Sequence, residues 1–312
     1  GAFVMDALLQ AQIPFILAFQ QFTFLTAPMD WLSRLGYEEF FIALIPLIYL
    51  GLDANTGARL ALVLLLGDSF NWALKMAFHA PRPYWIDSRV QAFHFTRDYG
   101  LPSGHAQNAT GVWFFLASAL RKKWMWVAAG AIVFLISLSR VYLGAHFITD
   151  VAGGWMFGGA FLFTFLWAEP KVKAWLNRAG FGGQVMAATV VAAAIVIVGL
   201  LMRGAIAGIP DPESWASFAA EARRLDSLIV DAGAFFGLGI GLAMARRWAQ
   251  FESGGPVRER LMRLIAGGVI AKKTGLIAAI LLFGKKFLVI ILAGFAAAGA
   301  WLKKRFAKGA DK

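Results

Sequence analysis

Residues 100–120 read GLPSGHAQNATGVWFFLASAL, a polar stretch that runs directly into an apolar one. Pro102, Ser103, Gly104 and His105 stand where the chain enters the apolar run. Similar apolar runs recur along the 312 residues, of which 59% are hydrophobic and only 15% are charged. About 20 apolar residues cross a bilayer as a helix, and this composition is too apolar for a soluble domain. We therefore predict an all-α integral membrane protein.

The apolar runs mark the candidate membrane spans. They lie near residues 7–27, 38–52, 57–78, 104–120, 124–143, 147–168, 183–202, 227–245, 264–284 and 287–302. We predict a six-helix transmembrane core at 5–168, an additional transmembrane hairpin at 169–250, and a basic, apolar membrane-associated segment at 251–312. Lysine pairs interrupt the last segment, which suits either a short snorkelled helix or an interfacial one.

Basic clusters between the spans orient the chain. They occupy residues 121–123, 171–178 and 246–263, which fall on one side if the spans alternate. The positive-inside rule makes that side cytoplasmic. The net charge of +12 then reflects topology and anionic lipid headgroups, and we expect no nucleic-acid partner. We predict a multi-pass protein of the inner (plasma) membrane, with residues 100–105 facing the periplasm or outside. The sequence does not indicate an oligomeric state.

Two cations mark the outer end of the third span. Lys75 lies seven residues before Arg82, which is flanked by Pro81 and Pro83. A lysine inside an apolar helix is costly unless it snorkels or meets an anion. The prolines end the helix and hold Arg82 in a rigid turn. The pattern indicates a cationic site at the membrane surface.

A histidine and an aspartate mark the junction of the fifth and sixth spans. His146 and Asp150 are four residues apart and share one face of a helix. The carboxylate can accept an N–H bond from the imidazole, which fixes the tautomer and leaves the other ring nitrogen as a nucleophile. Arg140 lies six residues before His146 and adds a third cation.

These outer helix ends together suit a phosphoryl group. Lys75, Arg82 and Arg140 match its oxygens, and Ser103 and the Gly104 N–H add donors at a helix N-terminus. Phosphoryl transfer needs positioning and charge stabilisation above all. We therefore expect no cofactor.

The histidines complete the chemistry that the pattern suggests. One histidine attacks phosphorus in line while the other protonates the leaving oxygen. The nearby carboxylates Asp87, Asp98 and Asp150 do not have the spacing of a metal-ligand cluster, so we expect no metal site.

Three ordered motifs resemble the signatures of the type 2 phosphatidic acid phosphatase (PAP2) superfamily. They are K-x6-RP at residues 75–83, PSGH at 102–105 and SR-x5-H-x3-D at 139–150. The resemblance covers about residues 5–168 and implies a six-helix transmembrane core. Residues 170–312 lie outside it.

The resemblance also implies roles for the motif residues. His146 would form a phosphohistidine, Asp150 would orient it, and His105 would act as the general acid. Phosphate binding would fall to Lys75, Arg82, Ser103, Gly104 and Arg140.

The resulting prediction is a metal-independent phosphatase that hydrolyses a lipid phosphate or diphosphate at the outer leaflet, with the bilayer as its partner. Three alternatives stay open. RPYW and PSGHA also resemble the glucose-6-phosphatase branch, which acts on a soluble sugar phosphate. Vanadate-dependent haloperoxidases have a similar pocket. A lipid transporter or scaffold with a vestigial site is the third alternative.

Other aromatic and histidine residues match no signature position. We predict structural or solvent-facing roles for His79 and His94, with contact to a substrate headgroup as the alternative. Tyr84, Trp85 and Trp113 are predicted to be interfacial aromatics.

Overall fold

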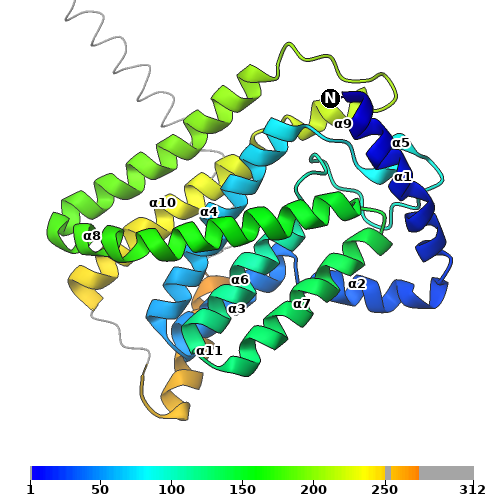
Figure 1. Ribbon diagram of the computed structural model, residues 1–312. Coiled ribbons are helices and arrows are strands. Elements are labelled where there is room, and N and C mark those ends of the chain that lie inside the picture. The colour runs from blue at the N-terminus through cyan, green and yellow to red at the C-terminus, as the bar shows by residue number, and fades with distance from the viewer. Residues whose placement is uncertain (1, 250–253, 274–312) are drawn as a thin grey trace, which may run out of the picture.

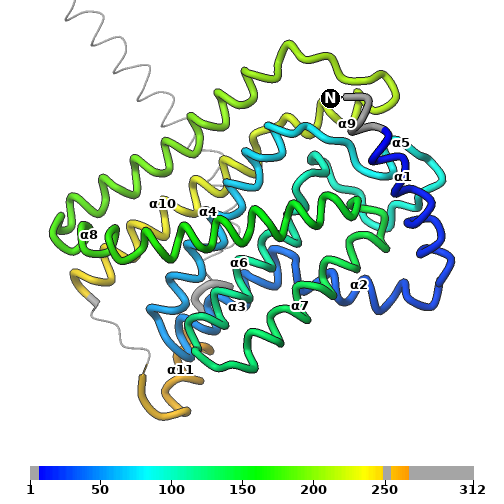
Figure 2. Tube along the Cα trace, viewed as in Figure 1, coloured from blue at the N-terminus to red at the C-terminus, as the bar shows by residue number. Residues whose placement is uncertain are grey.

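A computed structural model describes residues 2–249 and 254–273, and every regular element within them is helical (Figures 1 and 2). The all-α prediction is confirmed for these residues. The predicted span at 287–302 and most of that at 264–284 lie outside the described residues. The helices are α1 (Ala2–Gln20), α2 (Thr26–Arg34), α3 (Glu38–Gly51), α4 (Ala54–Phe78), α5 (Pro83–Ile86), α6 (Gly104–Leu120), α7 (Lys123–Tyr142), α8 (Ile148–Ala205), α9 (Ala216–Ala222), α10 (Asp226–Met244) and α11 (Val257–Lys273).

Four helical stretches in the described part of the chain are long and apolar enough to cross a membrane. They are Ala54–Ile86, Lys123–Tyr142, Ile148–Ala205 and Ala216–Trp248. The protein is therefore an integral membrane protein. The structure does not confirm the count of six core spans, because the expected spans at 38–52 and 104–120 are helices of 14 and 17 residues.

Local signals explain why these two helices are short. The helix α3 stops at Gly51 because the Asp53 side chain begins the next helix, accepting a hydrogen bond from the Thr56 N–H at 2.7 Å. The helix α6 ends at Arg121, which adopts a left-handed conformation with φ of 52°.

The predicted first span is bent. Residues Ala7–Gln20 and Thr23–Arg34 meet at 84°, and together they amount to at most one broken span. Gln20 fixes this corner, because its Nε2 donates to the backbone oxygens of Gln91 and Tyr142 at 2.8 and 2.9 Å. The bend carries α2 beneath the outer end of α7 (Figure 1).

The helix α8 covers two predicted spans, 147–168 and 183–202, and turns back on itself between them (Figure 1). The turn lies at Gly180, whose φ of 63° and ψ of −174° are open only to glycine at low cost. The exposed basic residues Lys171 and Arg178 lie just before the turn. The division of the chain into parts at residues 168 and 250 stays a prediction.

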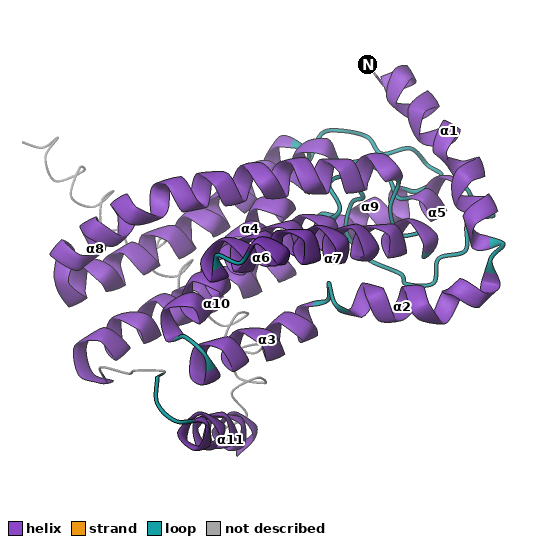
Figure 3. Cartoon of the chain, turned by 60° about the horizontal axis from the view of Figure 1, so that its bottom comes forward, coloured by secondary structure: helices purple, strands orange, loops and turns teal. Residues whose placement is uncertain are grey.

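Close packing brings the first turns of α6 and α8 together. A Cβ atom at Gly154 would lie 2.8 Å from the Ser103 oxygen, and one at Gly158 would lie 2.7 Å from the Gln107 oxygen. Only glycine permits this approach. A backbone hydrogen bond from Ser103 to the Asp150 oxygen, at 2.9 Å, joins the two helix ends. Figure 3 shows the long helices running alongside one another, so several helix ends meet at one place.

Candidate active site

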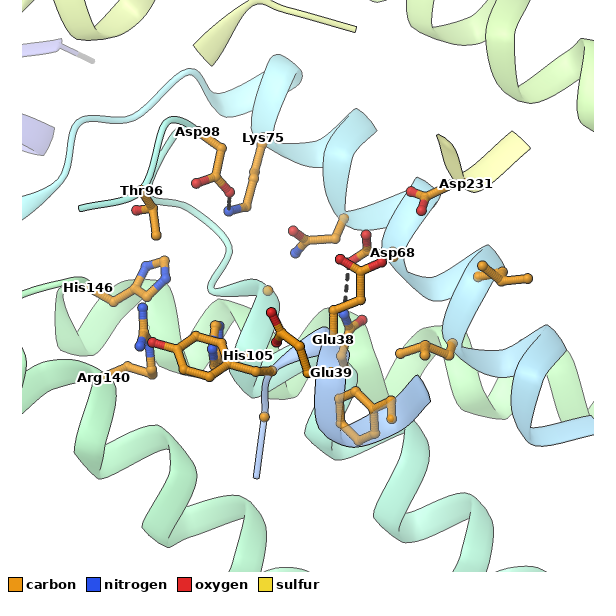
Figure 4. Close-up of a pocket in the computed structure, with 18 of the residues that line it drawn as sticks. Glu38, Glu39, Asp68, Lys75, Thr96, Asp98, His105, Arg140, His146 and Asp231 are labelled. Atoms are coloured by element: carbon orange, nitrogen blue, oxygen red, sulfur yellow. Dashed lines mark hydrogen bonds and ion pairs between the residues drawn. The ribbon is translucent and has the colours of Figure 1, made fainter. Parts of the chain in front are cut away.

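One cavity of about 340 Å³ collects the predicted site residues. Six of the eight line it: Lys75, Arg82, Gly104, His105, Arg140 and His146. The other two, Ser103 and Asp150, are buried directly behind this lining. The structure therefore brings the three motifs together from the ends of α4 and α7 and the starts of α5, α6 and α8 (Figure 4).

His146 lies between a carboxylate and a guanidinium. Its Nδ1 is 3.3 Å from Asp150 Oδ2, and its Nε2 is 3.1 Å from Arg82 Nη1. An arginine only donates hydrogen bonds, so Nε2 must be the accepting nitrogen and Nδ1 carries the proton. The Asp150 oxygen that accepts this proton is held in turn by the Phe147 N–H at 2.9 Å. The contacts assign a neutral tautomer whose Nε2 lone pair accepts from Arg82 at the cavity wall.

The surroundings of His146 keep it neutral. The residue lies in the loop before α8 and is 1% exposed. Burial lowers the pKa of His146 well below its usual range, and the nearby cations Arg82, Lys75 and Arg140 lower it further. At neutral pH the imidazole is therefore unprotonated.

Arg82 is fixed by a dense set of acceptors. It is the residue before α5, and Pro83 begins that helix. Its Nε donates to the Asp98 backbone oxygen at 2.7 Å, and its Nη1 donates to the Ala145 oxygen at 2.7 Å. Its Nη2 donates to the Tyr99 oxygen at 3.2 Å. The loop around the motif therefore sets the position of the guanidinium.

Asp98 bridges two of the predicted phosphate-binding cations. Its Oδ1 accepts from Arg82 Nη2 at 2.6 Å, and its Oδ2 pairs with Lys75 Nζ. Partial burial alone would raise the pKa of this carboxyl, but Arg82 and Lys75 outweigh it and hold the pKa well below its usual range. An ionised carboxylate thus contacts the cations that the sequence assigned to phosphate. No sequence pattern marked this role, because Asp98 lies in an irregular loop.

The guanidinium of Arg140 has hydrogen-bond donors without partners in the described part of the chain. Its Nη1 donates to Ser33 Oγ at 2.6 Å, whereas its Nε and Nη2 are fully buried and have no partner among the described residues. The guanidinium carbon lies 5.9 Å from the centre of the Tyr37 ring. Buried unpaired donors at a cavity wall suit an anionic ligand. Sequence reasoning did not find Ser33 or Tyr37, because the bend before α2 brings them here.

The start of α6 offers further donors. Ser103 caps the helix, since its Oγ accepts from the Ala106 N–H at 3.4 Å. In the described part of the chain the N–H groups of Gly104 and His105 have no partner. His105 Nε2 is also buried without a partner, and its ring stands edge-on to Tyr37 at 4.8 Å. This helix end can therefore receive an anion and place an imidazole beside it.

Within residues 2–249 and 254–273, no group of three or more His, Asp or Glu side chains has the arrangement of a metal site. Apart from Asp98, the charged side chains that line the cavity near His146 are cations, and cations and hydrogen-bond donors are the partners of a phosphoryl group.

Comparison with known proteins agrees with this geometry. The family model described as "PAP2 superfamily" matches residues 56–174. The chain is 32% identical over 158 residues to phosphatidylglycerophosphatase B of Bacillus subtilis (strain 168), covering 46% of this chain and 75% of that protein. The chain belongs to the PAP2 superfamily. Membership makes it a phosphatase.

Two further relatives of this PAP2 protein differ in their named substrates. The glucose-6-phosphatase catalytic subunit 1 of Haplochromis nubilus is 32% identical over 136 residues, 34% of this chain and 39% of that protein. Sphingosine-1-phosphate phosphatase 2 of Mus musculus is 30% identical over 133 residues, 39% of this chain and 36% of that protein. The chain thus spans well under half the length of these two relatives.

A solved structure was also matched. It is the crystal structure of a transmembrane PAP2-type phosphatidylglycerolphosphate phosphatase from Bacillus subtilis, with 27% sequence identity and a TM-score of 0.46. The match covers 54% of this chain and 88% of the other.

The two other histidines of this PAP2 protein lie outside the cavity lining. His79 ends α4 in a left-handed conformation with φ of 35°, and its N–H donates to the Lys75 oxygen at 2.8 Å. The ring of His94 pairs with Asp30 at 2.6 Å. The contact of His94 supports its predicted structural role, and the role of the His79 ring stays a prediction.

The aromatic residues after Arg82 are buried, so their predicted place at the membrane interface is wrong. Tyr84 and Trp85 are 9% and 4% exposed. The helix α9 covers them, with Phe218 stacked on Trp85 at 5.2 Å between ring centres. A segment beyond the family match therefore packs on the loop that follows Arg82. Trp113 is half-buried and packs against Phe40.

Proposed function

We propose that this PAP2 protein hydrolyses the phosphate or diphosphate of a membrane lipid, with His146 Nε2 as the nucleophile. The observation that carries the proposal is the pair of hydrogen bonds that His146 makes, one with Arg82 and one with Asp150. This pair fixes the tautomer and puts the lone pair on Nε2, where it becomes free to attack once Arg82 Nη1 donates to the substrate phosphate instead. A neutral imidazole held in this way is an activated nucleophile.

The substrate phosphate first takes the place of the Asp98 carboxylate on Lys75 and Arg82. Its remaining oxygens accept from Arg140 and from the N–H groups at the start of α6. The dianion also favours the protonated form of His105, because it brings negative charge into a site rich in cations.

The first chemical step forms a phosphohistidine. His146 Nε2 attacks phosphorus while the ester bond breaks, and His105 gives its proton to the leaving oxygen. Asp150 stabilises the positive charge on the imidazole by accepting a hydrogen bond from the Nδ1–H group. In the second step water attacks the phosphohistidine, His105 takes a proton from that water, and inorganic phosphate leaves.

Two features favour a lipid over a soluble sugar phosphate. The cavity opens among membrane-spanning helices, and apolar side chains of Phe41, Leu64 and Leu65 form part of its wall. Two of the relatives above are named for lipid phosphates. The basic clusters at the opposite helix ends favour a site on the periplasmic or outer side, with substrate from the outer leaflet.

The test is phosphate release by the purified protein from a panel of lipid phosphates, lipid diphosphates and glucose 6-phosphate. We expect release from lipids, no loss of activity in EDTA, and inhibition by vanadate, which mimics five-coordinate phosphorus. Release from glucose 6-phosphate alone would favour the sugar phosphatase, and bromide oxidation with vanadate would favour haloperoxidase chemistry. Activity lost in EDTA and restored by Mg²⁺ would contradict a metal-independent mechanism.

A further inference from the structure

The connection between α8 and α10, residues 206–225, packs against the outer face of the loop that carries the site. Its short helix α9 lies beside α5 in Figures 1 and 3. The family match ends at residue 174, so it contains no part of this connection. Two polar contacts join the connection to the loop: Glu221 pairs with Arg97 at the surface, and Arg223 contacts Tyr99 in the interior. The mechanism above uses none of these four residues.

Arg223 reaches the loop through a buried hydroxyl. Its Nε donates to Tyr99 Oη at 3.0 Å. Its Nη2 donates to the Ile209 backbone oxygen at 3.1 Å and pairs with Asp211 Oδ2 at 2.7 Å. Tyr99 is fully buried, and within the described residues Arg223 is the only hydrogen-bond partner of its hydroxyl. Contacts on two sides of the planar guanidinium hold it in one orientation, so residues 206–225 determine where the hydroxyl is bound.

The backbone on both sides of Tyr99 contacts the catalytic groups. The backbone oxygen of Tyr99 accepts from Arg82 Nη2 at 3.2 Å, and that of Asp98 accepts from Arg82 Nε at 2.7 Å. Gly100 packs so closely on Asp150 that a Cβ atom there would lie 3.0 Å from Oδ2. The position of residues 98–100 therefore sets where the guanidinium lies relative to the histidine that it contacts.

Loss of Arg223 would act on this backbone. A buried hydroxyl without a partner is costly, so the Tyr99 ring would move toward another donor or toward water. The backbone oxygens that hold Arg82 would move with it. The Asp98 carboxylate would stay paired with Lys75 on α4, so the change falls on the placement of the guanidinium and not on the competing anion. A misplacement of about 1 Å at a reacting group can cost about a hundredfold in rate.

We infer that Arg223 is a positioning residue for phosphate binding, which acts by holding Tyr99 and thereby the backbone that orients Arg82. The connection 206–225 is then part of the anion site, although none of its residues, all of them described, lines the cavity. This inference rests on the proposed role of Arg82 in binding phosphate, and it adds a residue from outside the family match to that role.

The experiment measures the inhibition constant of vanadate, together with KM and kcat for the lipid phosphate that the protein hydrolyses fastest. Arg223→Gln should raise the inhibition constant and KM by about tenfold each, with kcat changed less. Neither constant depends on the amount of active protein, so partial misfolding would lower the apparent kcat alone. Arg224→Gln is the matched control and should leave both constants unchanged, because Arg224 is exposed and pairs with Asp226 at 2.7 Å.

Tyr99→Phe tests the route from Arg223 to the site. The substitution keeps the buried ring and removes only the hydroxyl, and it leaves Arg223 its contacts with Ile209 and Asp211. We expect the inhibition constant of vanadate to rise as in Arg223→Gln, with no further rise in the double variant. Arg223→Lys, whose ammonium can still donate to the hydroxyl but lacks the planar fork, should give an intermediate value.

An unchanged inhibition constant in Arg223→Gln or Tyr99→Phe, or additive rises in the double variant, would overturn the positioning role and leave the phosphatase standing. If Arg223→Gln does not accumulate, Tyr99→Phe and Arg223→Lys decide the question by the same constant. Failure of well-folded wild-type protein to release phosphate from any lipid would instead overturn the proposed function.

Discussion

Arg82 donates two hydrogen bonds to Asp98: Nη2 donates to Oδ1 at 2.6 Å, and Nε donates to the backbone oxygen at 2.7 Å. The same carboxylate pairs with Lys75. One carboxylate is thus shared by two cations of the site and offsets one of their two positive charges. This arrangement lowers the cost of burying the two cations. It also means that every phosphate must compete with an internal anion.

Asp98→Asn should therefore tighten anion binding. The amide can still accept from Arg82, but it carries no charge to compete with phosphate. We expect the inhibition constant of vanadate to fall by about tenfold, equivalent to about 1.4 kcal/mol. Asp87→Asn, in the same loop and outside the cavity lining, is the matched control and should not change it. Weaker vanadate inhibition of Asp98→Asn would show that the carboxylate helps to build the anion site.

The low pKa of His146 sets the acid limit of activity. The attacking form is neutral, and the folded protein holds the pKa well below the ordinary value of about 6.5. After correction for ionisation of the substrate phosphate, kcat/KM should fall with decreasing pH only below about 6.5. Lys75→Gln removes one of the cations that lower the pKa of His146. The acid limb of the pH profile should therefore shift to higher pH, and the maximal kcat/KM should fall. If kcat/KM of the wild-type protein began to fall already above about pH 6.5, the assignment of His146 as a neutral nucleophile with a lowered pKa would be contradicted.

The side of the membrane that carries the site can be tested by labelling. The chain has no cysteine, so one introduced thiol is the only reactive one. Phe95 is 75% exposed in the loop beside the cavity, and Lys122 is exposed at the opposite helix ends. Phe95→Cys should react with an impermeant maleimide in intact spheroplasts, and Lys122→Cys only after lysis. The reverse pattern would place the site in the cytoplasm.

The sequence predicted the catalytic cluster because each motif stands at a helix end. The first turn of α8 sets the distance between His146 and Asp150, so their spacing of four residues predicted the contact. The prolines beside Arg82 likewise predicted a rigid turn. Local rules were sufficient for these residues.

Other parts of the site depend on packing that no local pattern indicates. Ser33 reaches Arg140 only because the chain bends after α1, and Asp98 reaches Lys75 through an irregular loop. Asp231 meets Asp68 across more than 160 residues of sequence, because α10 packs on α4. The apolar run predicted at 38–52 matches the helix α3 (Glu38–Gly51), which stops where Asp53 starts the next helix.

The central claim is that His146 carries the phosphoryl group. The most direct measurement is denaturation of the protein in alkaline detergent after mixing with lipid phosphate labelled with ³²P, followed by tests of the label's stability. We predict a label that survives alkali and is lost in acid. In His105→Ala, which lacks the acid of the first step and the base of the second, it should form more slowly and decay more slowly. It should be absent from His146→Ala, which should also lose turnover. Near-native turnover by His146→Ala, or a label that persists in it, would contradict the account.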